Sequence, residues 1–190
     1  MSCESIITAG IDKDCAALNA AIGVDKDLIL INYEDFDKKK TLDPTNRETT
    51  GSNIKGLKNI FLKFGTVRHV FEGTQFSVIP SIIPEVKEDG SGTWYQHQIL
   101  FTVYSKKAKD RKTIEALVGS RVIAVAVERS TGLYELFGMD IGLRVSTIER
   151  PYTGAQNSNF YQVTLLTPEI DVVKESGLGE LSALLTTNPS

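Results

Sequence analysis

The sequence predicts a mainly β (α+β) fold, an antiparallel β-sandwich or partial barrel with one flanking helix. Three observations lead to this prediction. Short runs rich in β-branched and aromatic residues follow one another at close spacing between residues 57 and 168. Segments rich in Gly, Ser, Asp and Asn separate them, as β-hairpins require. Within this region a single stretch, residues 106–118, repeats its apolar residues at helical spacing instead.

The same patterns divide the chain into three parts. Residues 1–56 comprise an N-terminal arm, a first strand and a long polar loop, residues 57–168 comprise the β core, and residues 169–190 form a C-terminal tail. The first strand is the β-branched run 28–31, which is too short for a buried helix and ends at an acidic turn. This division places the compact β structure in the middle of the chain.

The loop after the first strand, residues 36–56, is the most polar stretch of the sequence. A connection of about twenty residues inside a compact domain is uncommon and is usually functional or mobile. Lys38, Lys39 and Lys40 lie near its start, and they form either a nucleic-acid patch or part of a solvated loop. The absence of interleaved aromatic residues favours the solvated loop.

Several core strands have a clear two-residue period. Residues 121–127 are apolar at both odd and even positions, which predicts a central strand that is buried on both faces. Residues 94–104 and 160–166 alternate instead, which predicts one buried face each. The side chains expected on those faces are Ile99, Phe101, Val103, Tyr161, Val163 and Leu165. Further strands are expected at residues 59–64, 67–71, 75–83, 133–137 and 144–148.

Residues 75–94 have the character of an extended hairpin arm. Pro80 and Pro84 cannot donate backbone hydrogen bonds, which confines this strand to an edge or an arm. The segment Glu-Asp-Gly-Ser-Gly, centred on Gly90, supplies the tip, and Trp94 begins the returning strand. We therefore expect a hairpin that reaches beyond the core.

The helix predicted at residues 106–118 has Ser105 as its N-cap and Gly119 just past its end. Its apolar face consists of Ile114, Leu117 and Val118. Its basic residues oppose the helix dipole at the N-terminus, and they either meet an acidic neighbour or form a solvated surface. These residues are Lys106, Lys107, Lys109, Arg111 and Lys112.

The C-terminal tail carries Leu181, Leu184 and Leu185 after a glycine-rich break. A segment of this length does not form stable structure alone. It therefore needs a surface to lie on, either its own domain or a neighbour.

The composition excludes several classes of protein. The 190 residues include 21 Lys and Arg against 24 Asp and Glu, so the net charge of −3 supplies no strong field toward DNA or anionic membranes. No apolar run approaches the length of a membrane span, and the N-terminus lacks the regions of a signal peptide. Cys3 and Cys15 allow at most one disulfide. We expect a protein that folds in a reducing compartment.

The sequence carries no catalytic or cofactor signature. His69 and His97 lie in separate β runs without Cys, Asp or Glu at metal-ligand spacing, so we expect no metal. Residues 138–142 are glycine-rich but connect two strands, so they lack the helix N-terminus that cradles phosphate. The sequence therefore predicts a protein that is not an enzyme and binds no cofactor.

Two parts of the chain resemble a known family. The first comprises the opening Met-Ser-Cys-Glu-Ser-Ile, Gly10, Cys15 and the run Leu-Ile-Asn-Tyr-Glu-Asp-Phe at residues 30–36. The second comprises Gly-Leu-Tyr-Glu-Leu-Phe-Gly-Met-Asp-Ile-Gly-Leu at residues 132–143, with Gly154 and the run 161–165. Both resemble structural proteins of Bacteroidetes phages that are similar to tail-tube and tail-ring subunits, including the ring proteins beneath the portal of crAss-like phages.

The resemblance implies a tail-tube-like β-sandwich whose copies form a ring, of six or twelve subunits, around a DNA channel. Its expected partners are further copies, neighbouring tail, ring or portal proteins, and genomic DNA that passes without specific binding; no membrane is involved. The expected location is the virion tail, after assembly in the host cytoplasm. Loop 36–56 would then contact an adjacent ring. The residues expected at subunit contacts are Pro80, Pro84, Gly90, Trp94, Lys38, Lys39, Lys40, Leu181, Leu184 and Leu185.

Two other functions are also compatible with the sequence. The aromatic strand 94–104 also suits a small β-barrel ligand-binding module, which would need a closed apolar pocket. A hydrolase with unrecognised carboxylates would draw on Glu128, Glu135 and Asp140.

Overall fold

A computed structural model describes residues 24–46, 57, 59–63, 65–66, 68–73, 76–86, 93–104, 108–129, 134–150, 160–168 and 186–187. Its strands are β1 (Val24–Asn32), β2 (Phe61–Leu62), β3 (His69–Glu72), β4 (Val78–Val86), β5 (Thr93–Tyr104), β6 (Arg121–Glu128), β7 (Tyr134–Phe137), β8 (Leu143–Glu149), β9 (Phe160–Leu166) and β10 (Thr186–Thr187). Its helices are α1 (Lys38–Thr41) and α2 (Ala108–Leu117), with 3-10 turns η2 (Tyr33–Asp35) and η3 (Pro44–Asn46).

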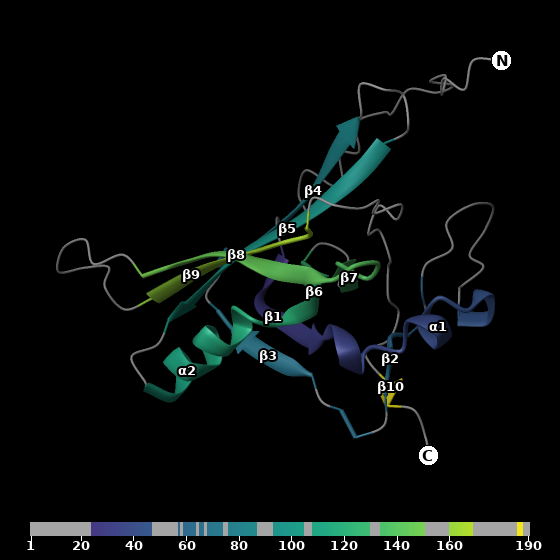
Figure 1. The fold of residues 1–190 in the computed structure, drawn as a ribbon, viewed down its shortest axis with the longest axis horizontal. Helices are drawn as coiled ribbons and strands as arrows, with labels where there is room; N and C mark the ends of the chain where they lie inside the picture. The colour runs from purple at the N-terminus through teal and green to yellow at the C-terminus, as the bar shows by residue number, and fades with distance from the viewer. Residues whose placement is uncertain are drawn as a thin grey trace.

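Eight strands form one antiparallel sheet in the order β3-β1-β6-β8-β9-β5-β4, with β7 paired to β6 beside this path. The sheet curls so that β1 also contacts β4 across its interior, but it remains open, with β3 and β4 as its two edges. Helix α2 lies beside β3 (Figure 1). The predicted class, mainly antiparallel β with a flanking helix, is confirmed.

The inner core fills the curl of this sheet. Its members are buried side chains of β1, β4, β5, β6, β7, β8 and β9, together with two residues of α2. They include Leu28, Leu30, Ile99, Phe101, Ile114, Leu117, Val122, Ala124, Leu143, Tyr161, Val163 and Leu165. The one-sided burial predicted for residues 94–104 and 160–166 is therefore confirmed.

A separate outer core covers the other face of β1 and β6. Ile29 and Ile31 of β1 and Ile123 and Val125 of β6 contribute to it, so the central position predicted for β6 is confirmed. Apolar side chains from residues 36–62 cover this face, namely Phe36, Leu57, Ile60 and Leu62, with Leu42 packed against them.

The placement of β1 differs from the division made on the sequence. β1 lies between β3 and β6 in the sheet, whereas the sequence division put the first strand outside the core that begins at residue 57. The sequence pattern predicts a strand at the β-branched run. It does not indicate which strands pair with it, because those strands lie far along the chain.

Helix α2 runs over Ala108–Leu117, shorter than the predicted 106–118, and Ser105 lies outside the described residues. Ile114 and Leu117 are buried as expected, but Val118 is 62% exposed because the helix ends before it. Gly119 follows the helix without the left-handed backbone that a C′ glycine supplies. Among the described helices, none has the length and apolar character needed to cross a bilayer.

Candidate functional site

Strands β4 and β5 form a hairpin whose outer half leaves the body of the sheet. β4 pairs with β5 along its whole length, from Val78 opposite Phe101 to Val86 opposite Thr93. β9 pairs with β5 only from Gln98 onward. His97 is still attached to the body, because its backbone N–H donates to the Thr167 hydroxyl and its carbonyl oxygen accepts from the Thr167 N–H. Residues 83–86 and 93–96, which we name the distal hairpin, are therefore two-stranded in the described structure and extend about 13 Å. Figure 1 shows β4 and β5 projecting from the body, as predicted for an arm.

The two prolines of β4 lie at positions that leave its pairing with β5 intact. The carbonyl oxygen of Ser77 accepts a hydrogen bond from the Thr102 backbone N–H at 2.9 Å. Since ladder partners alternate, odd-numbered residues of β4 bond to β5 and even-numbered residues direct their backbone groups to the free edge. Pro80 and Pro84 therefore remove two donors from that edge, which makes it a poor template for another strand.

The outward face of this hairpin is uncharged between Ile79 and Ile83 of β4. Ile79 is 54% exposed and Ile83 is 41% exposed, whereas Val78 is buried in the inner core. The residues opposite Ile79, Ser81 and Ile83 on β5 are Leu100, Gln98 and Gln96. Between Ile79 and Ile83, this face therefore offers apolar, hydroxyl and amide side chains without a charge.

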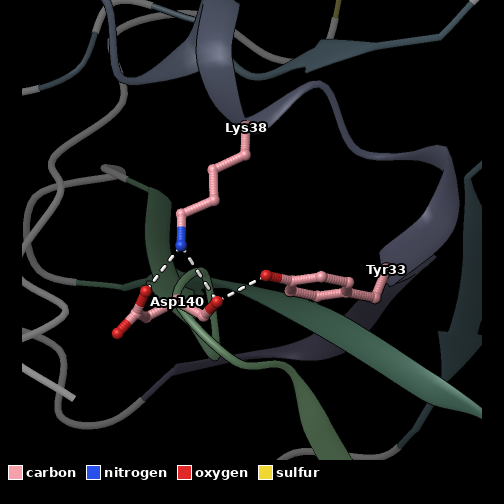
Figure 2. Close-up of polar contacts among 3 residues, drawn as sticks. All are labelled: Tyr33, Lys38 and Asp140. Atoms are coloured by element: carbon pink, nitrogen blue, oxygen red, sulfur yellow. Dashed lines mark hydrogen bonds and ion pairs between the residues drawn. The ribbon is translucent and has the colours of Figure 1, made fainter. Parts of the chain in front are cut away.

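The three consecutive lysines of α1 have separate roles. The Lys38 ammonium contacts the Asp140 carboxylate at 2.5 Å and donates to the Asp140 carbonyl oxygen at 3.0 Å. The Tyr33 hydroxyl donates to the same carbonyl oxygen. Figure 2 shows the three side chains converging from α1, η2 and the β7–β8 turn. We name Tyr33, Lys38 and Asp140 the clasp.

The other two lysines point elsewhere. The Lys40 ammonium lies 4.8 Å from the centre of the Phe61 ring, and Lys39 is exposed. The three lysines therefore do not act as one patch: one is an ion-pair partner, one lies over an aromatic ring and one is solvated. The solvated-loop interpretation fits the exposed Lys39 and Lys40 but not the ion-paired Lys38.

Arg121 and Gly142 complete the surroundings of the clasp. The Arg121 guanidinium lies 3.9 Å from the centre of the Tyr33 ring, and it contacts the Glu34 carboxylate at 3.0 Å. Gly142 has a φ of +79°, and a Cβ there would lie 2.5 Å from Arg121 Cγ. The turn thus needs glycine both for its backbone and for the close approach of these side chains.

Further polar contacts fasten residues 41–46 to the body. The buried Asn46 side chain donates to the Thr41 and Asn59 carbonyl oxygens, each at 2.7 Å, and accepts from the Asn59 backbone N–H at 3.2 Å. The Thr41 hydroxyl accepts from the Phe61 N–H at 3.0 Å. The described part of loop 36–56 is therefore a fixed cover over the outer core. The sequence predicted a long polar loop here and did not indicate that Phe36 and Leu42 would pack at the outer core.

Asp43 forms a local turn within this cover. Its carboxylate accepts hydrogen bonds from the Thr45 hydroxyl at 2.6 Å and from the Thr45 N–H at 2.9 Å. These two hydrogen bonds lower the pKa of Asp43 below its ordinary value, and the hydroxyl contributes more than the N–H. Desolvation acts in the opposite direction and is the smallest of the three effects. The carboxylate is fully exposed, and its role is to hold the turn before η3.

The two histidines occupy different environments. His69 lies exposed on β3, whereas His97 is 2% exposed on β5. His97 Nδ1 accepts a hydrogen bond from the Gly138 N–H at 3.0 Å, and its ring packs against Phe137. It joins β5 to the β7–β8 turn, which is a structural role. Within the described ranges, no group of three or more His, Cys, Asp and Glu residues could hold a metal ion.

A groove of about 570 Å³ beside the β3 edge was not expected from the sequence. Its walls include Val70, Phe71 and Glu72 of β3, Tyr104 of β5, and Thr113 and Ile114 of α2. Val70 is 50% exposed and Tyr104 is 56% exposed. The three elements that form the groove are distant in sequence. The sequence pattern indicates the alternation within each strand, but it does not indicate that β3, β5 and α2 lie side by side.

The remaining predicted contact residues are only partly described. Gly90, Leu181, Leu184 and Leu185 lie outside the described residues, and Trp94 lies in β5 within the distal hairpin, where its backbone alone is described. Comparisons of this chain with protein-family models, with curated proteins and with solved structures find no match.

Proposed function

We propose that this protein is a virion structural protein, a ring-forming subunit of a phage tail or head–tail connector around the DNA channel. The observation that carries the proposal is the distal hairpin, which extends from the body as two strands with Ile83 exposed on its outer face. An isolated two-stranded hairpin is marginally stable in water. A neighbouring subunit that covers it would supply the missing burial.

Two further features support this proposal. The sequence resembles phage tail-tube and tail-ring proteins at residues 30–36 and 132–143, and residues 30–36 and 134–143 lie in the body of the fold. The net charge of −3 suits a channel through which DNA slides during genome ejection, because strong phosphate binding would hold the DNA in place. The proposal assigns the protein no catalytic role, no cofactor and a location in the virion tail.

The alternative of a ligand-binding barrel receives less support. Such a module needs an open interior, whereas the inner core fills the curl of the described sheet with packed side chains such as Ile99, Phe101 and Val163. The hydrolase alternative also lacks support, because the Asp140 carboxylate is paired with Lys38 in a turn.

The test combines two measurements on the full chain. Mass spectrometry of purified virions is expected to detect the protein, and negative-stain microscopy of the purified protein at high concentration is expected to show rings of six or twelve copies. A chain that is absent from virions and strictly monomeric at high concentration would overturn the proposal.

A further inference from the structure

We propose that the groove beside β3 receives the distal hairpin of a second copy, in a head-to-tail contact. This inference rests on the proposed ring-forming function and names the two surfaces that would meet. It assigns the receiving side of the contact to Val70 and Tyr104, and the inserting side to the hairpin that carries Ile83.

The first argument is the inequality of the two sheet edges. β4 lacks backbone donors at Pro80 and Pro84 on its free side. β3 is the opposite edge, and its four residues, His69 to Glu72, include no proline. A pairing of two copies through their β4 edges is thus disfavoured, and β3 is the edge that retains its donors. The strand of a partner's hairpin that meets β3 is therefore β5, whose residues 93–96 are not paired with β9.

The second argument is the match of side chains. The hairpin presents Ile79 and Ile83 among neutral residues, and the groove presents Val70 and Tyr104 around its opening. These four are among the six exposed large hydrophobic residues of the described structure. Burying them against one another removes apolar surface from water on both copies, and the groove wall also includes the charged residues Arg68, Glu72 and Asp110.

The third argument is distance within one chain. Gln96, opposite Ile83, and Tyr104, at the groove, lie on the same strand and are separated by about 27 Å. A copy therefore cannot place its own distal hairpin in its own groove. The contact must join different surfaces of two copies, which is the heterologous geometry that closes into rings when the rotation permits.

The test uses three single substitutions at exposed positions. Ile83→Lys blocks the hairpin, Val70→Lys blocks the groove, and Val118→Lys is the matched control, since Val118 is exposed and is not part of the groove wall. Circular dichroism and thermal unfolding establish that each variant is folded. Sedimentation velocity over a concentration series then measures assembly of the full-length chains.

We expect Ile83→Lys and Val70→Lys each to weaken self-association at least about thirtyfold, the change typical of a hot-spot residue. Val118→Lys assembles as the unmodified chain does. An equimolar mixture of the two blocked variants forms a 1:1 dimer, because one intact groove and one intact hairpin remain, and this dimer cannot grow further.

Each contrary result has a distinct meaning. If the unmodified chain forms rings and Val70→Lys forms them equally well, the groove assignment is wrong and the ring function stands. If both variants lose assembly but their mixture forms no dimer, the two surfaces do not meet each other. If the unmodified chain never assembles, the proposed function fails and this inference fails with it.

Discussion

Loop 36–56 and the distal hairpin were both expected to contact neighbouring subunits, but they differ in how they are attached to the sheet. The described part of loop 36–56 lies on its own sheet, held by the outer core and the clasp. The distal hairpin instead leaves the sheet and is paired with nothing but itself among the described strands. Both contain polar residues and turn signals. The difference shows that a few buried side chains, such as Phe36 and Asn46, decide whether a polar segment belongs to its own fold.

The largest expected effect comes from the packed segment. Phe36→Ala removes a ring that is 4% exposed in the outer core, and we expect it to lower the free energy of unfolding by about 3–5 kcal/mol. Ile83→Ala, in the distal hairpin, should lower it by about 0.5 kcal/mol or less. Urea unfolding of the monomeric proteins measures both. Equal losses would mean that the hairpin is as much a part of the body as the cover.

The next effect tests the turn beneath the clasp. Gly142→Ala forces a left-handed alanine and brings its Cβ against Arg121 and Tyr33, so we expect a loss of about 2–3 kcal/mol. Gly65→Ala is the matched control. Gly65 has nearly the same φ, +77°, with no atom within 4 Å of the added Cβ, so it should lose only about 1–2 kcal/mol. Identical losses by thermal unfolding would show that the contacts around Gly142 contribute nothing.

A smaller effect is expected for the ion pair of the clasp. Lys38→Met removes the contacts to Asp140, and because both side chains are partly exposed we expect a loss of about 0.5–1 kcal/mol that shrinks in high salt. Lys39→Met, on the exposed side of α1, should leave the free energy of unfolding unchanged. A stability change for Lys39 that matches that of Lys38 would contradict the separate roles assigned to the lysines.

The smallest effect concerns Asp43. Its pKa is lowered in the folded protein, so its contribution to stability is present above the pKa of the unfolded chain and is lost as the pH falls through the folded value. Thr45→Ala removes the hydroxyl donor and should raise the pKa of Asp43, as measured by NMR titration. Thr113→Ala is the control, because its hydroxyl bonds to a carbonyl oxygen on α2. An unchanged pKa in Thr45→Ala would exclude the hydroxyl as the cause.

The strands of the sheet could be predicted because the sequence patterns that indicate them are local. Alternation in residues 94–104, 121–127 and 160–166 reports which faces are buried, and glycine and proline mark the strand ends. The order of strands was not predictable, since β1 pairs with β3 and β6 through contacts between distant parts of the chain.

The candidate site was predictable only in part. Pro80 and Pro84 indicated an edge or arm, and they lie on the β4 edge of the projecting hairpin. The cover was missed because Phe36 and Leu42 are single apolar residues in a polar stretch, with neither a helical nor a strand period. The β3 groove was missed because its walls come from three elements that only the folded chain brings together.

The central claim is that contacts between subunits stabilise the distal hairpin, whereas the body of the fold is stable in the monomer. Hydrogen exchange, measured by mass spectrometry on dilute monomer and on the assembled protein, tests it most directly. We expect amides of residues 94–96 to exchange rapidly in the monomer and to become protected on assembly, while those of residues 99–103 stay protected in both. Equal and strong protection of residues 94–96 in both states would contradict the claim.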